Sequence, residues 1–263
     1  MAKLGTAPIT AADLKEFTNA DSDFAFEMTV LNWLQNNGFG CQHSATYRDP
    51  ITGKLRQFDI RAEITSDIHT LALAVECKNL RPNFPLLIST MPRTDVEAFH
   101  SVILFHRGTA NSFEVKSVDG IGMYRPNRPV GKTTDQVGRE DHSKELVSND
   151  EQTFDKISQA INGCRDLVER FSREVSDVQK RIIVPVLVVP SGTLWQVSYD
   201  AAGAIAISPT QVQHSNVFLD SSWDAKSPYG DELSYRISHL EIVAFDGLND
   251  AVNAWLSPRG FFS

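Results

Sequence analysis

The chain has 263 residues, of which 41% are hydrophobic and 22% are charged, and its formal net charge is −8 at pH 7. This composition is typical of a globular protein, and no apolar run approaches the roughly 20 residues that span a bilayer. The acidic balance argues against a general affinity for nucleic acid, although a local basic strip can still bind phosphate. Residues 1–12 lack the apolar core of a signal peptide.

Three widely spaced cysteines, Cys41, Cys77 and Cys164, favour a reducing compartment over a disulfide framework or a zinc site. We therefore expect a cytoplasmic protein with no membrane association. A chain of this length can bury one sizeable core, so we expect a single domain over residues 1–263.

After a short lead-in of about twenty residues, the first predicted helix covers residues 22–36. Four apolar residues and one acid recur there at three- and four-residue spacing: Phe24, Glu27, Val30, Leu31 and Leu34. This pattern places the Glu27 carboxylate on the face that packs against the core. The sequence Asn36-Asn37-Gly38 is typical of a helix end.

Three strands are predicted next. The first covers residues 41–48, and the turn residues 49–54 connect it as a hairpin to a second strand over residues 57–64. A further turn at Ser66-Asp67 leads into a third strand over residues 71–78.

Successive side chains of a strand point to opposite faces of the sheet. The second strand then has one apolar face (Phe58, Ile60, Ala62, Ile64) and one polar face (Gln57, Asp59, Arg61, Glu63). The third strand has an apolar face made of Leu71, Leu73, Val75 and Cys77. Glu76 and Lys78 point the other way, so the two strands are expected to bring Asp59, Glu76 and Lys78 together.

Two carboxylates and one amine can hold a divalent cation and stabilise a pentavalent phosphate. The alternatives are structural: an ion pair between Glu76 and Lys78 on an exposed face, a solvent-facing Asp59, and a Glu27 paired with a core lysine or tyrosine. The functional interpretation is favoured because the run is too apolar for an exposed strand, and an unpaired buried charge is costly.

The rest of the chain predicts further elements. Prolines interrupt residues 81–92, residues 102–105 form a short strand or a helix end, and residues 124–144 read as a long polar loop. A capping box at 148–151 begins the clearest helix, over about residues 149–178. Strands at 182–189, 194–199 and 241–245 and a closing helix at 247–256 follow.

Glu27 on a helix, Asp59 on one strand and Glu76-Cys77-Lys78 on the next resemble the PD-(D/E)xK, or restriction-endonuclease-like, nuclease superfamily. The resemblance covers about residues 22–80. It implies an α/β fold with a mixed central sheet flanked by helices in the order αβββαβ, a core over about residues 22–190, and strands and a helix of residues 191–263 packed on or beside that core.

The resemblance also implies Mg²⁺-dependent hydrolysis of phosphodiester bonds, with Mn²⁺ able to substitute. Asp59 and Glu76 would ligate the metal, Glu27 would be an outer ligand, and Lys78 would position the attacking water or stabilise the transition state. The expected substrate is DNA, and the expected setting is microbial defence or restriction. A homodimer is expected if single-site subunits cut both strands, and a partner subunit could supply specificity or activation.

Two other functions stay open at this point. The chain could be a nuclease-fold subunit without catalytic activity that binds nucleic acid or protein within a larger complex. It could also be an unrelated α/β protein whose charged strands form an interface with a partner.

Overall fold

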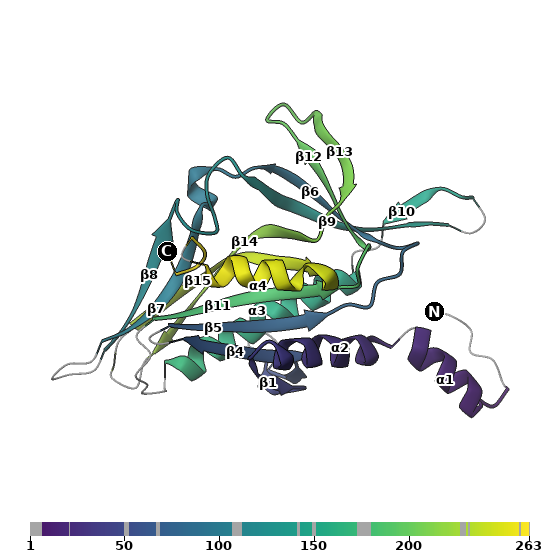
Figure 1. The fold of residues 1–263 in the computed structure, drawn as a ribbon, viewed down its shortest axis with the longest axis horizontal. Helices are drawn as coiled ribbons and strands as arrows, with labels where there is room; N and C mark the ends of the chain where they lie inside the picture. The colour runs from purple at the N-terminus through teal and green to yellow at the C-terminus, as the bar shows by residue number, and fades with distance from the viewer. Residues whose placement is uncertain are drawn as a thin grey trace.

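The fold is α/β, with one large mixed sheet and helices on both of its faces (Figure 1). The computed structural model describes residues 7–20, 22–49, 53–66, 69–106, 112–140, 143–148, 151–172, 180–226, 230, 232–257 and 259–262. Within them lie four α-helices: α1 (Ala11–Ala20), α2 (Asp23–Asn36), α3 (Glu151–Phe171) and α4 (Leu248–Leu256). Two 3₁₀ turns, η1 (Asp95–Glu97) and η2 (Phe245–Gly247), complete the helical part.

Over the described residues the large sheet has 13 strands, and its main path runs β1-β4-β5-β11-β15-β14-β9-β6-β12-β13. In chain order these strands are β1 (Gly40–His43), β4 (Ile60–Ser66), β5 (His69–Cys77), β6 (Leu86–Pro92), β9 (Pro129–Arg139), β11 (Lys180–Val189), β12 (Leu194–Tyr199), β13 (Ile205–Gln211), β14 (His214–Lys226) and β15 (Glu232–Ala244). Off the path, β10 (Leu146–Ser148) pairs with β9, and β7 (Phe99–His106) pairs with β11 and with β8 (Ser112–Asp119). A separate two-stranded sheet is formed by β2 (Thr46–Arg48) and β3 (Leu55–Gln57).

The centre of the sheet is made by β4, β5, β11 and β15. The β4 and β5 strands pair antiparallel, whereas β5 with β11 and β11 with β15 pair parallel. The β5 and β11 strands are buried almost throughout, because helices cover both of their faces. The sequence prediction of buried strands at these two places is confirmed.

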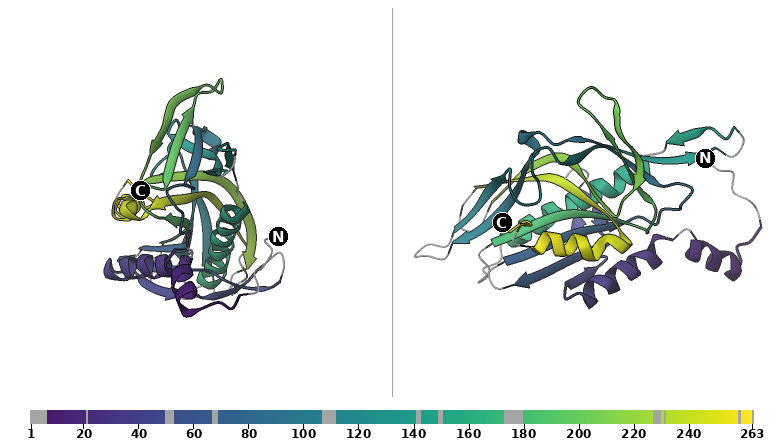
Figure 2. Two further views of the ribbon diagram at one scale, coloured as in Figure 1. Left: turned by 90° about the vertical axis from the view of Figure 1, so that its right-hand side faces the viewer. Right: turned by 45° about the horizontal axis from the view of Figure 1, so that its top comes forward.

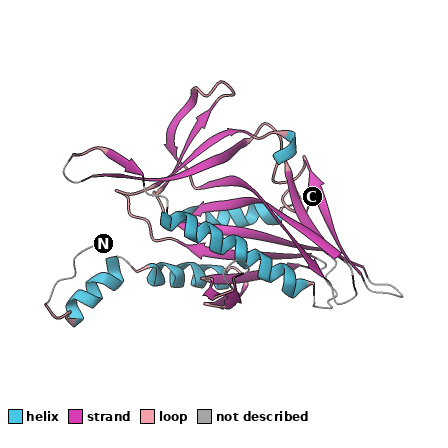
Figure 3. Ribbon diagram, turned by 180° about the vertical axis from the view of Figure 1, so that it is seen from behind, coloured by secondary structure: helices cyan, strands magenta, loops and turns pink. Residues whose placement is uncertain are grey.

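Helices α2 and α4 lie on one face of the central strands and α3 lies on the other (Figures 2 and 3). On the first face, Leu71, Leu73 and Val75 of β5 pack with Val30 and Leu34 of α2 and with Trp255 of α4. On the second face, Ala72 and Ala74 pack with Cys164 and Leu167 of α3. The predicted alternation along β5 is therefore confirmed, and its small side chains allow α3 to approach the sheet closely.

The predicted helix over residues 22–36 is confirmed as α2, which begins at the N-cap Ser22 and is followed by Gly38 at a φ of 86°. Val30, Leu31 and Leu34 are buried as expected, but Phe24 is 59% exposed. The first twenty residues were expected to be only a short lead-in, but they contain helix α1.

The hairpin region differs from its prediction. The strand expected over residues 41–48 is two strands, β1 and β2, separated at Ser44, whose φ is 51°. The turn expected at 49–54, of which residues 50–52 lie outside the described part, connects β2 to β3 and not to the Asp59 strand. Asp59 lies directly before β4, and Phe58 packs with Ala45 and Tyr47 in a cluster apart from Ile60. The expected shared face of Phe58 and Ile60 is wrong because the chain is not in a regular strand at residue 58.

Residues 124–144 were expected to form a loop, and this prediction is wrong. Most of the segment is β9, an eleven-residue strand that pairs with β6 and β10. Its polar residues look like a loop in the sequence because much of the strand is half-buried or exposed. Residues 102–105 belong to β7.

Helix α3 begins at Glu151 and ends at Phe171. The helix was expected to continue to about residue 178. Residue 172 is not helical, and residues 173–178 lie outside the described part. The expected capping box includes residues 149 and 150, which also lie outside them. The strand predicted at 194–199 is β12, the strand predicted at 241–245 is the end of β15, and the helix predicted at 247–256 is α4. The sequence did not predict β13 and β14. Among the described residues, no helix combines the length and apolar character needed to cross a membrane.

Candidate active site

Asp59 and Glu76 lie side by side, as the sequence predicted. The antiparallel register of β4 and β5 pairs Ile60 with Val75, which places Asp59 beside Glu76. The Asp59 amide donates a hydrogen bond to Glu76 Oε1 at 3.3 Å, and the Cys77 amide donates to Asp59 Oδ2 at 2.7 Å. The two carboxylates are thus held by the backbone at the C-terminal end of β5.

The ammonium group between these carboxylates belongs to Lys156 of α3. Its Nζ atom donates to Asp59 Oδ2 at 2.7 Å and to Glu76 Oε2 at 3.2 Å. The Glu76 side chain is fully buried, and the side chains of Asp59 and Lys156 are only 13% and 14% exposed. This is a nearly dry cluster of two carboxyl groups and one ammonium group.

Sequence reasoning missed Lys156, although a signal for it exists. Lys156, Ala160 and Gly163 recur at four- and three-residue spacing on the helix face that meets the sheet. A lysine among small residues on the inner face of a helix indicates a buried partner, because an unpaired buried ammonium is costly.

Lys78 lies one residue beyond β5 and is half-buried. Its backbone amide donates to the Val188 carbonyl at 3.0 Å, which continues the pairing with β11. Lys78 therefore lies near the end of the same strand as Glu76, and its expected role in transition-state stabilisation stays a prediction.

Glu27 faces the same region from α2. Its Oε2 atom lies 3.3 Å from Nε2 of His43 on β1. Burial, and then the charge of Asp59, raises the pKa of Glu27, while His43 and Lys156 oppose this shift. His43 is the hydrogen-bond partner that orients the Glu27 carboxylate.

The buried charges shift each other's protonation. Burial, and then the charge of Asp59, raises the pKa of Glu76 well above its ordinary value, although Lys156 opposes the shift. Burial opposes the charged form of Lys156, but Glu76 and Asp59 outweigh it and raise the pKa of the lysine. Lys156 thus keeps its proton at neutral pH.

The cluster is a partial match to a metal centre. Two carboxylates that already share one cation are suitable oxygen donors for a hard divalent ion. Across the part of the chain that is described, however, no group of three or more His, Cys, Asp or Glu side chains is arranged to hold a metal ion. A metal ion at Asp59 and Glu76 would therefore take the place that the Lys156 ammonium holds.

A hollow of about 400 Å³ is lined by residues of the β2–β3 hairpin and of α3. These residues are Thr46, Leu55, Arg56, Gln57 and Gln159. Gln57 is two residues before Asp59, and Gln159 is one helical turn beyond Lys156. The polar lining and the Arg56 guanidinium give this hollow donors suited to a polar, anionic ligand.

A second buried polar cluster lies on the other face of the sheet. The Glu241 carboxylate is fully buried and accepts a hydrogen bond from Tyr124 Oη at 2.7 Å. Arg93, which is 2% exposed, donates to His239 Nε2 at 3.2 Å and to Asn216 Oδ1 at 2.6 Å. These groups satisfy one another, which indicates a structural network.

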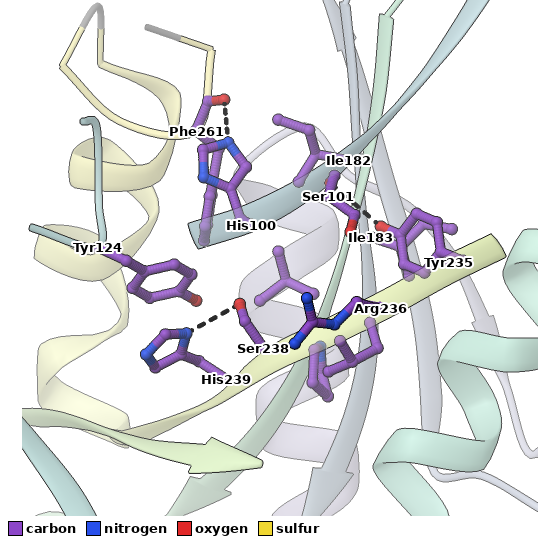
Figure 4. A pocket seen from close by; sticks show the side chains of 13 residues that line it. His100, Ser101, Tyr124, Ile182, Ile183, Tyr235, Arg236, Ser238, His239 and Phe261 are labelled. Carbon is purple, nitrogen blue, oxygen red and sulfur yellow. Dashed lines mark hydrogen bonds between the residues drawn. The ribbon is translucent and has the colours of Figure 1, made fainter. Parts of the chain in front are cut away.

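Figure 4 shows a small cavity beside this network, where His100, Tyr124 and His239 lie together with Phe261. His100 Nε2 lies 3.0 Å from the Phe261 carbonyl oxygen, which ties the chain terminus to β7. The cavity has a volume of about 10 Å³. This volume is at the lower limit for one water molecule, so the cavity has no room for a substrate.

No family model, no curated protein and no solved structure matches the chain. The residues and their geometry are therefore the basis for assigning a function.

Proposed function

We propose that the chain is a metal-dependent nuclease that hydrolyses phosphodiester bonds of DNA. The observation that carries this proposal is the cluster of Asp59, Glu76 and Lys156, in which two carboxylates and an ammonium meet in a buried position. A cluster of this kind is a weak stabiliser, because desolvation offsets much of the attraction between its charges. Perturbed carboxyl groups of this sort are more typical of functional sites.

The arrangement of elements around the cluster supports the same proposal. The order α2, β1, β4, β5, α3, β11 follows the αβββαβ pattern of the PD-(D/E)xK superfamily if β2–β3 and β6–β10 are additions to it. The PD-(D/E)xK motif has its first acid on one strand and its second acid on the next; here Asp59 lies one residue before β4, and Glu76 belongs to β5, the antiparallel neighbour of β4.

In the proposed reaction, Asp59 and Glu76 hold the divalent ion, and Glu27 contributes from the edge of the site. Mg²⁺ bound there would activate water and neutralise the charge that develops on the phosphate. The Cys77 amide keeps the Asp59 carboxylate aligned. Lys156 retains its proton, so its ammonium is suited to donate to a phosphate oxygen and is poorly suited to act as a base.

A second candidate function is a nuclease-fold subunit that binds a partner without hydrolysis. It is favoured by the two hydrogen bonds of Lys156, because they already neutralise much of the charge that a metal ion would otherwise balance. In that case the three side chains form a structural ion cluster and nothing more.

Incubation of supercoiled plasmid DNA with the protein in Mg²⁺, in Mn²⁺ or in EDTA distinguishes the two functions. The proposal predicts nicked or linear DNA with either metal ion and none in EDTA, and no cleavage by Asp59→Asn. The matched control is Asp220→Asn, since Asp220 is an exposed partner of Arg236 far along the chain. Intact plasmid under all conditions would favour the non-catalytic subunit.

A further inference from the structure

The position of the Lys156 ammonium has a consequence for metal binding. It is hydrogen-bonded to one oxygen of each carboxylate, at 2.7 Å from Asp59 Oδ2 and 3.2 Å from Glu76 Oε2. Those carboxylates are the same groups that a divalent ion would use. A metal ion and an ammonium repel each other, so contact of both with the same pair of carboxylates is unfavourable.

The backbone that carries Lys156 has little freedom to withdraw. One turn before it, Thr153 Oγ1 donates to Gln136 Oε1 at 3.2 Å, which ties the start of α3 to β9. Two turns after it, Gly163 lies so close to the sheet that a Cβ atom there would be 3.2 Å from Ala74 Cβ. Any displacement of the ammonium is therefore a movement of the flexible side chain and not of the helix.

We propose that Lys156 is an internal counter-cation, which holds Asp59 and Glu76 together in the metal-free protein and is displaced from both carboxylates when a divalent metal ion binds. This inference rests on the metal-binding part of the proposed function. The metal-free protein thereby avoids two adjacent unpaired carboxylates, and metal binding frees an ammonium group beside the site. The same exchange lowers the affinity for the metal, because the ion has to break two charge-assisted hydrogen bonds.

Calorimetric titration with Mn²⁺, without nucleic acid, tests this competition. Lys156→Met removes the charge and keeps most of the aliphatic side chain, so it should bind Mn²⁺ about tenfold more tightly or better than the wild type. Lys116→Met removes the charge of an exposed lysine and is the matched control, and its affinity should not increase. Equal or weaker binding by Lys156→Met would overturn the proposal, as would the absence of Mn²⁺ binding in all three proteins.

The wild-type protein provides a second test that does not depend on how the variant folds. Reductive methylation of lysines, read by mass spectrometry, should label Lys156 slowly in EDTA and several-fold faster in saturating Mg²⁺. Lys116, whose side chain is 55% exposed, should be labelled equally in both conditions. Equal labelling of Lys156 with and without Mg²⁺ would contradict its displacement.

These results separate the inference from the nuclease proposal. Tighter Mn²⁺ binding by Lys156→Met without any DNA cleavage by the wild type would support the counter-cation and refute the nuclease. Metal-dependent cleavage by the wild type, together with an unchanged Mn²⁺ affinity of Lys156→Met, would support the nuclease and refute the counter-cation.

Discussion

Replacement of Glu76 by glutamine should change how the stability of the metal-free protein depends on pH. Burial, and then the charge of Asp59, raises the pKa of Glu76 well above its ordinary value. The folded chain therefore holds a proton that the unfolded chain releases above about pH 4.3. Between the unfolded and the folded pKa the native state binds more protons, so the stability of the wild type falls as the pH rises. Glu76→Gln has no carboxyl proton at this position, so its stability should not fall with rising pH for this reason.

The magnitude follows from proton linkage. One proton held only by the folded state changes the free energy of unfolding by about 1.4 kcal/mol per pH unit. From about pH 5 to about pH 7, the advantage of Glu76→Gln over the wild type should grow by as much as about 2.7 kcal/mol. For a chain of this size, this corresponds to about 5–11 °C in melting temperature. If the amide introduced by Glu76→Gln weakens a hydrogen bond, it lowers the free energy of unfolding equally at both pH values, so this effect cancels when the two pH values are compared.

Thermal unfolding followed by circular dichroism, in EDTA at the two pH values, measures this growth. The control is Glu232→Gln at the exposed start of β15, which removes a carboxylate outside the buried cluster. A difference between Glu76→Gln and the wild type that stays constant or shrinks as the pH rises would refute the reasoning.

Three further predictions concern single side chains. Gly163→Val should lower the free energy of unfolding, measured by chemical denaturation, by about 1–3 kcal/mol, because a Cβ atom at Gly163 would already lie 3.2 Å from Ala74 Cβ. Gly40→Ala should lower it less, because its Cβ would have only an ordinary 3.7 Å contact, and a tolerated valine at residue 163 would contradict the close packing of α3. Arg93→Met should lower the free energy of unfolding by about 3–5 kcal/mol, because it leaves the buried acceptors on His239 and Asn216 without their donor. A decrease below about 1 kcal/mol would show that these acceptors find other donors. Lys78→Ala should slow plasmid cleavage at saturating Mg²⁺ without weakening Mg²⁺ binding, and an unchanged rate would rule out its expected role.

The elements with a long and regular pattern could be predicted from the sequence. The α2 helix has a clear apolar stripe, and β5 and β11 are continuous apolar runs, so their existence and type follow from local spacing. The proximity of Asp59 and Glu76 was also predictable, because the two strands are consecutive and pair antiparallel.

Lys156 was not predictable in the same way. It is 80 residues from Glu76 and 97 residues from Asp59 along the chain, and the contact depends on how α3 packs on the sheet. That packing is set by the absence of a side chain at Gly163 opposite Ala74, which is a tertiary property. The β9 strand was missed for a related reason, since its hydrogen bonds to β6 and β10 stabilise a strand whose own residues are largely polar.

The most direct test of a metal-dependent site at Asp59 and Glu76 is anomalous diffraction from crystals of the protein grown with Mn²⁺. A metal ion held by Asp59 and Glu76 should give an anomalous peak in contact with an oxygen of each carboxylate, at about 2.0–2.6 Å, with the Lys156 ammonium moved away from both. Carboxylates that remain hydrogen-bonded to Lys156, with no peak between them at saturating Mn²⁺, would contradict a metal site there.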